Sequence, residues 1–194
     1  MIEKLIEEIE KGNLIITPTD TVYGISADAT NIEAIKKVFE AKKRENKPLL
    51  ILVSSIDMLK EYVSEINEVQ EKLMNYWPDK LTILFKKNDK VNDLITCGSE
   101  YIGIRIPDNK LLLYIINKIK KPLISTSANI SGEPVITNTT LINDELKKYI
   151  SYILDDGEKP NVSSTLLKVD NNKIIFLREG EIATKIKNEF KEYI

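Results

Sequence analysis

Apolar residues recur along the chain at two spacings. Spacings of three and four residues predict helices over residues 2–11, 30–42, 57–63, 65–76, 109–120 and 143–149, with a last helix beginning near residue 182. Short apolar or alternating runs predict strands over residues 14–16, 49–53, 81–85, 101–106, 121–124, 153–154, 163–169 and 173–177. Residues 91–100 have weak periodicity and predict a mobile loop. The alternation of strands and helices predicts an α/β fold with some parallel pairing.

The first predicted strand ends in a turn rich in hydroxyl groups. Leu14 to Ile16 is a short apolar run, and Pro18, which lacks an amide proton, marks the point at which sheet pairing ends. Tyr23 and Gly24 are expected to close the turn. An extended chain would turn the hydroxyl groups of every second residue to one side, here Thr17, Thr19 and Thr21. They form either a shelf for a small polar ligand or an ordinary strand and turn, because threonine also favours strands.

Two further parts of the sequence are basic: the loop of residues 42–47 and Arg105. Residues 42–47 carry four cations in six positions, just after a predicted helix. Cations complement the dipole at a helix C-terminus, so this loop is either a solvated helix end or a phosphate site. Arg105 lies in the alternating strand, on the face opposite its isoleucines. A buried arginine needs an anionic partner, which is either a structural carboxylate or a ligand.

A polar segment, Ser125–Pro134, follows the predicted strand at residues 121–124. Hydroxyl and backbone N–H groups at a strand end can bind an oxyanion or a phosphate without a glycine-rich loop. The same composition is also that of an ordinary loop, so both interpretations remain. The sequence contains no P-loop and no dinucleotide-binding glycine pattern.

Composition narrows the possible chemistry. The chain has 194 residues, 42% of them hydrophobic, without a linker or repeat, which predicts one domain over residues 1–194. A net charge of −2 disfavours a primary nucleic-acid binder but allows a local basic pocket. The sequence contains no histidine, which excludes serine–histidine and cysteine–histidine hydrolysis and histidine zinc sites.

The remaining composition bears on location. Cys97 has no partner for an intramolecular disulfide, and we expect it to be a small packed core residue in a reducing compartment. The N-terminus is acidic and helically periodic, unlike a signal peptide, and no apolar run reaches membrane-spanning length. These features predict a cytoplasmic protein with no membrane association.

Several short motifs occur in a characteristic order. They are Pro18–Gly24, Lys42-x-Arg44 with Lys47-Pro48-Leu49, Trp77-Pro78, Gly103–Pro107, Ser125–Asn129 with Ser131-Gly132, Ser164-Thr165 and Leu177–Gly180. In this order they resemble the threonylcarbamoyl-AMP synthase family with the YrdC-like fold, over roughly residues 10–182. The resemblance implies a twisted mixed parallel and antiparallel sheet with flanking helices, around a large concave basic cavity.

The resemblance also implies a function. It implies an L-threonylcarbamoyladenylate synthase, a nucleotidyltransferase that condenses L-threonine, bicarbonate and ATP and releases pyrophosphate. Mg²⁺ would arrive with ATP, no metal site would belong to the protein itself, and a tRNA-threonylcarbamoyl transfer complex would be a partner. By motif position, catalytic roles fall on Lys42, Arg44 and Arg105. L-threonine would contact Thr21, Arg105, Ser125 and Ser164. ATP would contact Arg44, Lys47, Ser127, Asn129, Val135 and Arg178.

The sequence departs from the family pattern in places. The loop of residues 42–47 is one residue shorter, which leaves the partner of Lys47 open, and Tyr101 and Leu52 replace residues of other types. Two alternatives remain: an RNA-binding module of the same fold, with weak RNA binding in its basic cavity, and a related enzyme that makes another carbamoyl adenylate. No strong base is evident, so bicarbonate or a bound water is expected to accept the amine proton.

Overall fold

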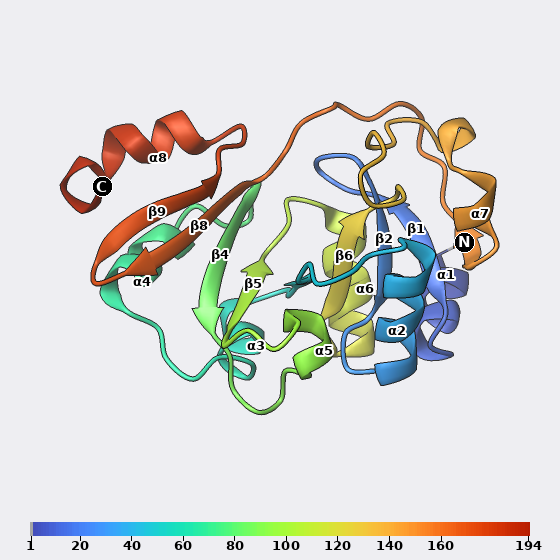
Figure 1. Ribbon diagram of the computed structural model, residues 1–194, viewed down its shortest axis with the longest axis horizontal. Helices are drawn as coiled ribbons and strands as arrows, with labels where there is room; N and C mark the ends of the chain where they lie inside the picture. The colour runs from blue at the N-terminus through green and yellow to red at the C-terminus, as the bar shows by residue number, and fades with distance from the viewer. Residues whose placement is uncertain (1) are drawn as a thin grey trace.

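The computed structural model describes residues 2–194, and the strands of this part of the chain form one nine-stranded sheet (Figure 1). In spatial order the strands are β7 (Ile150–Ile153), β1 (Leu14–Pro18), β2 (Tyr23–Asp28), β6 (Leu123–Ser127), β3 (Leu50–Leu52), β5 (Tyr101–Arg105), β4 (Leu81–Lys86), β8 (Thr165–Asp170) and β9 (Lys173–Arg178). Within residues 2–194 the pairs β1–β7, β3–β5 and β4–β8 are parallel, and the other neighbours are antiparallel. The predicted mixed sheet is confirmed.

Helices flank this sheet. The α-helices are α1 (Ile2–Glu10), α2 (Ile32–Ala41), α3 (Ile56–Lys60), α4 (Glu68–Met74), α5 (Asp93–Thr96), α6 (Lys110–Ile119), α7 (Asp144–Lys147) and α8 (Ala183–Glu189). Short 3-10 helices are η1 (Thr139–Leu141) and η2 (Lys191–Tyr193). No helix within residues 2–194 has both the length and the apolar character needed to cross a membrane.

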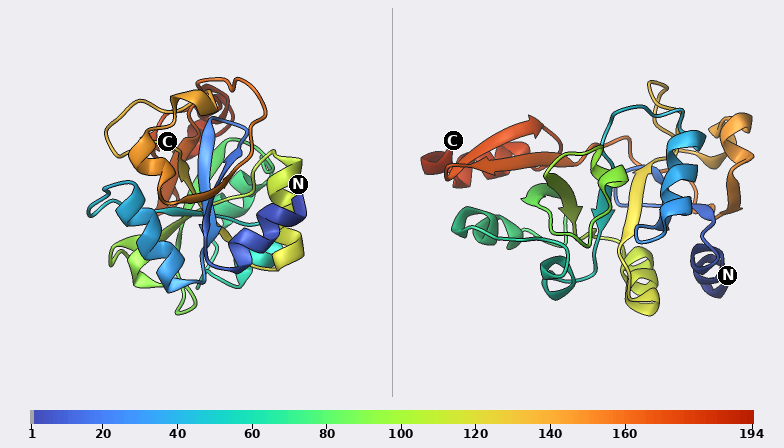
Figure 2. Two further views of the ribbon diagram at one scale, coloured as in Figure 1. Left: turned by 90° about the vertical axis from the view of Figure 1, so that its right-hand side faces the viewer. Right: turned by 60° about the horizontal axis from the view of Figure 1, so that its bottom comes forward.

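Alternation along the strands assigns side chains to the two faces of the sheet. Ile15 of β1 packs in a cluster with α1 and α6, whereas Leu14 and Ile16 pack in the cluster that contains α2. Helix α2 therefore covers one face of this half of the sheet, and α1 and α6 cover the other (Figures 1 and 2). Leu5 of α1 is fully buried there, and burial of one such side chain is worth roughly 1.5–3 kcal/mol.

The other half of the sheet is covered on one face only. Phe85 of β4 and Ile104 of β5 are fully buried in the core cluster that includes residues of α3, α4 and α8. The alternate residues of the same strands, such as Leu84 and Gly103, line a cavity on the opposite face. The hairpin of β8 and β9 extends this half of the sheet, with α8 beside it (Figure 1). One face of the sheet is thus left open for a ligand.

The structure corrects several predicted boundaries. Tyr23 and Gly24 do not close the turn; they begin β2, a strand that the sequence did not predict. Thr17 lies in β1 with its side chain buried against Ser26, away from the cavity. Strand β6 continues to Ser127 and therefore includes the first residues of the polar segment that we expected to follow the strand.

Other corrections concern surface positions. Within the predicted loop at residues 91–100 the structure contains the short helix α5, which Asn92 caps through its side chain. Cys97 follows this helix in a left-handed conformation and is exposed, so the prediction of a packed core residue was wrong. Its placement follows from the helix end, where the chain turns outward. The predicted single domain over residues 1–194 stays a prediction, and residue 1 lies outside the described residues.

Candidate active site

A cavity of about 630 Å³ lies on the open face of the sheet. Residues of seven strands line this cavity. Within a strand the lining residues are often two positions apart, because such side chains point to the same face of the sheet. Leu50 and Leu52 of β3 lie beside Tyr101, Gly103 and Arg105 of β5, and residues of β2, β4, β6, β8 and β9 complete the strand positions of the lining. The turn between β1 and β2 and the segment of residues 161–164 complete it. The cavity therefore unites positions from both ends of the chain.

The turn between β1 and β2 is held by the hydroxyl group of Thr19. Its Oγ1 donates to Val22 O (2.6 Å) and accepts from the N–H groups of Thr21 (3.1 Å) and Val22 (3.2 Å). Gly24 permits this closure, because a Cβ there would lie 2.9 Å from the Thr19 methyl carbon. The hydroxyl of Thr21 lies 2.9 Å from Thr19 Oγ1, and either oxygen can be the donor of this contact. Thr21 also lines the cavity, so its hydroxyl group is within reach of a ligand.

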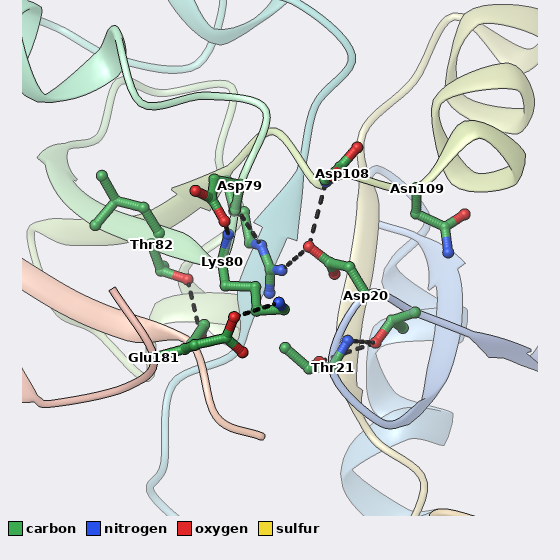
Figure 3. Close-up of polar contacts among 12 residues, drawn as sticks. Asp20, Thr21, Asp79, Lys80, Thr82, Asp108, Asn109 and Glu181 are labelled. Atoms are coloured by element: carbon green, nitrogen blue, oxygen red, sulfur yellow. Dashed lines mark hydrogen bonds and ion pairs between the residues drawn. The ribbon is translucent and has the colours of Figure 1, made fainter. Parts of the chain in front are cut away.

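Arg105 is anchored by two groups of the protein. Its Nε donates to Asp79 O (3.1 Å), and its Nη2 forms an ion pair with Asp20 Oδ2. The side chains of Arg105 and Asp20 are both only 7% exposed. Asp20 Oδ2 also accepts from the N–H of Asp108 (3.2 Å), the contact drawn between these two residues in Figure 3. The anionic partner that the sequence required for Arg105 is therefore a carboxylate of the adjacent turn.

Two other arginines line the cavity and are anchored in the same manner. Arg44 donates from Nε to Lys47 O (2.7 Å) and from Nη2 to Pro48 O (2.6 Å). Arg178 donates from Nε to Ser164 O (2.8 Å) and from Nη2 to Ser164 Oγ (2.7 Å). Each guanidinium group is thus fixed through its Nε and Nη2 edge.

The three arginines have the same unused edge. Within residues 2–194, no hydrogen bond or ion pair involves the Nη1 atom of Arg44, Arg105 or Arg178. A guanidinium has five N–H donors in a rigid fork that matches carboxylate and phosphate oxygens. These edges are therefore preorganised to bind anions, and Asp20 is the single acidic residue in the lining that opposes their charge.

Burial and mutual repulsion set the electrostatics. Burial lowers the pKa of Arg44 and of Arg105, and for Arg105 the charge of Asp20 opposes that shift. Burial and the nearby charge of Arg105 lower the pKa of Arg178. All three stay cationic at neutral pH because the ordinary pKa of arginine is so high. The repulsion between Arg105 and Arg178 favours an anionic ligand between them.

Serine hydroxyl groups complete the polar lining. Ser125 and Ser127 of β6 face the cavity, and their hydroxyl groups take no hydrogen bond from the rest of residues 2–194. Ser164 accepts from Arg178 and retains its own proton for a ligand or for Thr82, 3.5 Å away. Gly180 packs against this segment so closely that a Cβ would overlap the backbone of residues 163–165. Together with Thr21, these hydroxyl groups bring the predicted L-threonine residues to one cavity.

The predicted ATP residues divide into two groups. Arg44, Ser127, Val135 and Arg178 line the cavity. Lys47 is exposed and Asn129 is 6% exposed, and neither belongs to the lining. Asn129 donates from Nδ2 to Glu133 O (2.6 Å), which turns it into its own loop. Their roles at the nucleotide stay predictions.

Lys42 is buried beneath the site. Its Nζ donates to Ser127 O (2.6 Å), Asn129 O (2.7 Å) and Asn129 Oδ1 (3.4 Å), so all three of its protons are used. Its own carbonyl accepts from Ser131 N (2.9 Å). These oxygens favour the ammonium form, but burial and the charge of Arg44 lower the pKa of Lys42 to about 7. Lys42 does not line the cavity. Its side chain connects the C-terminal end of α2 to the backbone of residues 127–129, and its catalytic role stays a prediction.

Sequence reasoning missed Asp20. The residue lies within the first motif, next to Thr21, and lines the cavity. The signal that could have found it was the need of Arg105 for a carboxylate, but nothing in the sequence brings two positions so far apart together. The described residues contain no group of three or more carboxylate, cysteine or histidine side chains that could hold a metal ion. A metal at this cavity would take most of its ligands from a phosphate substrate and from water.

Taken together, the mixed sheet and the cavity with three anchored arginines define an α/β protein built to bind polyanionic small molecules. The family model described as Sua5_yciO_yrdC, telomere recombination, matches residues 7–180. The chain belongs to this Sua5/YciO/YrdC family. The resemblance found in the sequence and the YrdC-like fold are both confirmed.

Relatives support this assignment. A Methanocaldococcus jannaschii protein, whose name assigns it threonylcarbamoyl-AMP synthase activity provisionally, is 40% identical over 94% of this chain and 86% of its own length. The threonylcarbamoyl-AMP synthase of Pyrococcus abyssi is 35% identical over 89% of this chain and 52% of its own length. The crystal structure of P. abyssi Sua5 in complex with L-threonine superposes with a TM-score of 0.92 and 33% identity, over 99% of this chain and 58% of that one. The chain therefore spans about half of the Pyrococcus protein.

Proposed function

We propose that this chain is an L-threonylcarbamoyladenylate synthase, which makes threonylcarbamoyl-AMP and pyrophosphate from L-threonine, bicarbonate and ATP. The observation that carries the proposal is the set of three arginines, each anchored by two nitrogens and open at Nη1, around a cavity lined with hydroxyl groups. The names of the relatives support the same activity, including the one bound to L-threonine.

The chemistry has two steps. The amine of threonine attacks the carbon of bicarbonate, a C–N bond forms, and water leaves, with bicarbonate or a bound water taking the amine proton. A carbamate oxygen then attacks the α-phosphorus of ATP and pyrophosphate leaves. Both steps bring anions together, so they need alignment, neutralisation of charge and exclusion of water more than a strong base.

The residues divide between the two substrates. Arg105, Thr21, Ser125 and Ser164 form the threonine subsite, where Nη1 of Arg105 would bind the carboxylate. Arg44, Ser127, Val135 and Arg178 contact ATP, and the unused edges of Arg44 and Arg178 neutralise its phosphates. Lys42 holds the backbone of Ser127 and Asn129, which shapes the phosphate side of the cavity.

The partners follow from the product. Mg²⁺ arrives as part of the ATP substrate and supplies charge neutralisation at the phosphates. The threonylcarbamoyl group passes to a tRNA-threonylcarbamoyl transfer complex. We therefore propose that the protein works beside that complex in the cytosol. Cell fractionation and co-purification with that complex test this part.

A direct assay tests the activity. The protein is incubated with ATP, Mg²⁺, ¹⁴C-bicarbonate and each of the common amino acids, and both pyrophosphate and labelled adenylate are measured. We expect release of pyrophosphate that depends on L-threonine and bicarbonate together. Release with a different amino acid would assign the protein to the related carbamoyl-adenylate enzymes. Salt-sensitive RNA binding without stabilisation by ATP would favour an RNA-binding module instead.

A further inference from the structure

The ion pair between Asp20 and Arg105 leaves one carboxylate oxygen unused. Oδ2 of Asp20 accepts both available donors, Nη2 of Arg105 and the N–H of Asp108 (3.2 Å). Oδ1 is enclosed, yet no donor from residues 2–194 bonds to it. A buried carboxylate oxygen without a partner is unfavourable, so its presence beside a cavity points to a missing donor.

We propose that Asp20 Oδ1 is the acceptor for the α-amine of the amino-acid substrate. This assignment rests on the proposed function and adds to it a residue for the reacting nitrogen. Asp20 belongs to the cavity lining, beside Thr21 (Figure 3). The proposal requires rotation about the Cβ–Cγ bond of Asp20, a soft torsion in aspartate, to turn the enclosed Oδ1 toward the cavity.

The surrounding groups complement an α-amino acid. Nη1 of Arg105 offers unused N–H donors, which suit the carboxylate of the substrate. The hydroxyl oxygen of Thr21, which lines the cavity, can accept a hydrogen bond, which suits an ammonium group. Asp20 Oδ1 is the second acceptor on the same turn. Donors therefore lie on one side of this subsite and acceptors on the other.

A purely structural ion pair explains the arrangement less well. Structural arginine–carboxylate pairs gain most when two parallel bonds use both oxygens. Here the Nε of Arg105 turns to Asp79 O (3.1 Å) instead, and both donors to Asp20 meet at one oxygen. The pairing with Arg105 also offsets the negative charge of Asp20. Asp20 can therefore accept a hydrogen bond from the amine without strongly favouring the ammonium form of the substrate.

The test separates the amine from the rest of the ligand. Isothermal titration measures the affinity for L-threonine and for (2S,3R)-2,3-dihydroxybutanoate, in which a hydroxyl replaces the amine. The variants are Asp20→Asn and, as a matched control, Asp28→Asn, which alters another buried carboxylate that is paired with Lys121 (2.7 Å) away from the cavity. Circular dichroism checks that each variant is folded.

We expect Asp20→Asn to weaken L-threonine binding by about tenfold or more, because the amine loses a charged acceptor. Its affinity for the dihydroxy acid should change less than about threefold, and Asp28→Asn should change neither affinity. Equal losses for both ligands would mean that Asp20 acts only by holding Arg105, and would overturn the proposal. So would unchanged binding of L-threonine.

The wild-type protein provides an independent test if Asp20→Asn does not fold. The proposal requires it to bind L-threonine at least about tenfold more tightly than the dihydroxy acid, and similar affinities would overturn it. A wild-type protein that binds no L-threonine would refute the proposed function itself. The two failures are therefore distinguishable.

Discussion

Arg105 and Asp20 form a buried ion pair that joins the end of β5 to the turn between β1 and β2. Removal of one partner leaves the other charged and buried, which typically costs about 3–5 kcal/mol. We expect Arg105→Leu to lower the free energy of unfolding by that amount. Adding Asp20→Leu should recover most of the loss, because the double variant buries no charge. Urea denaturation measures both, and a double variant no more stable than Arg105→Leu would contradict this expectation.

Arg44 and Arg178 present their unused edges, and neither forms an ion pair with a carboxylate among residues 2–194. We expect Arg44→Ala and Arg178→Ala each to lower kcat/KM for pyrophosphate release by at least about tenfold, because each removes a charged donor to the phosphates. Stability should change little. The control is Lys43→Ala, in the same loop as Arg44, since Lys43 pairs at the surface with Glu145. Activity as low in Lys43→Ala as in Arg44→Ala would refute the site.

Lys42 should make stability depend on pH. Its pKa is about 7 in the folded protein and 10.5 ordinarily. Between these values the unfolded chain binds the proton and the folded chain does not, so stability rises with pH, by at most about 1.4 kcal/mol per pH unit. Urea denaturation from pH 7 to 10 should show this rise in the wild type. Lys42→Met should remove the rise, whereas Lys121→Met should retain it.

Gly180 should tolerate no side chain. A Cβ there would overlap the backbone of residues 163–165, which carries Ser164. We expect Gly180→Ala to cost about 1–3 kcal/mol in thermal unfolding and to lower activity, because the anchor of Arg178 moves. Glu179→Ala, on the exposed neighbour, is the control. A stable, fully active Gly180→Ala protein would show that this contact is looser than described.

Lys120 ends α6 in a left-handed conformation, with φ of 54°. Glycine adopts this conformation without strain, so Lys120→Gly should raise stability by about 0.5–1 kcal/mol. Lys118→Gly, inside the same helix, should lower it by about 1 kcal/mol. Thermal unfolding measures the change in Tm of each variant. The two changes should have opposite signs if α6 ends at Lys120, and the same sign if it does not.

The sequence predicted the parts of the fold that depend on local pattern. The alternation around Arg105 correctly assigned its side chain to the face opposite the isoleucines, where the cavity lies. The strands predicted over residues 163–169 and 173–177 are present as β8 and β9, and Asn171 and Asn172 join them with positive φ, which asparagine tolerates well. The strand β2 was missed because its first residues, Tyr23 and Gly24, also suit a turn.

Local pattern was not enough for caps and long side chains. Thr30 and Asn31 both suit the cap of α2; Asn31 caps the helix, whereas the N–H and hydroxyl of Thr30 both bond to Asp28. Likewise Asn109 caps α6 through its side chain, although Asp108 before it is also a favoured capping residue. The direction of the Lys42 side chain depends on carbonyl groups contributed by residues 127 and 129, which no nearby sequence specifies.

The distribution of the lining along the chain has a consequence for folding. Arg44 follows α2 and Arg178 ends the last strand, so no short fragment of the chain contains the whole of the proposed ATP subsite. A substrate that contacts both must bind only after the entire sheet has assembled. Nucleotide should therefore slow hydrogen exchange at amides that open by whole-molecule unfolding, and leave the fraying helix ends as they are.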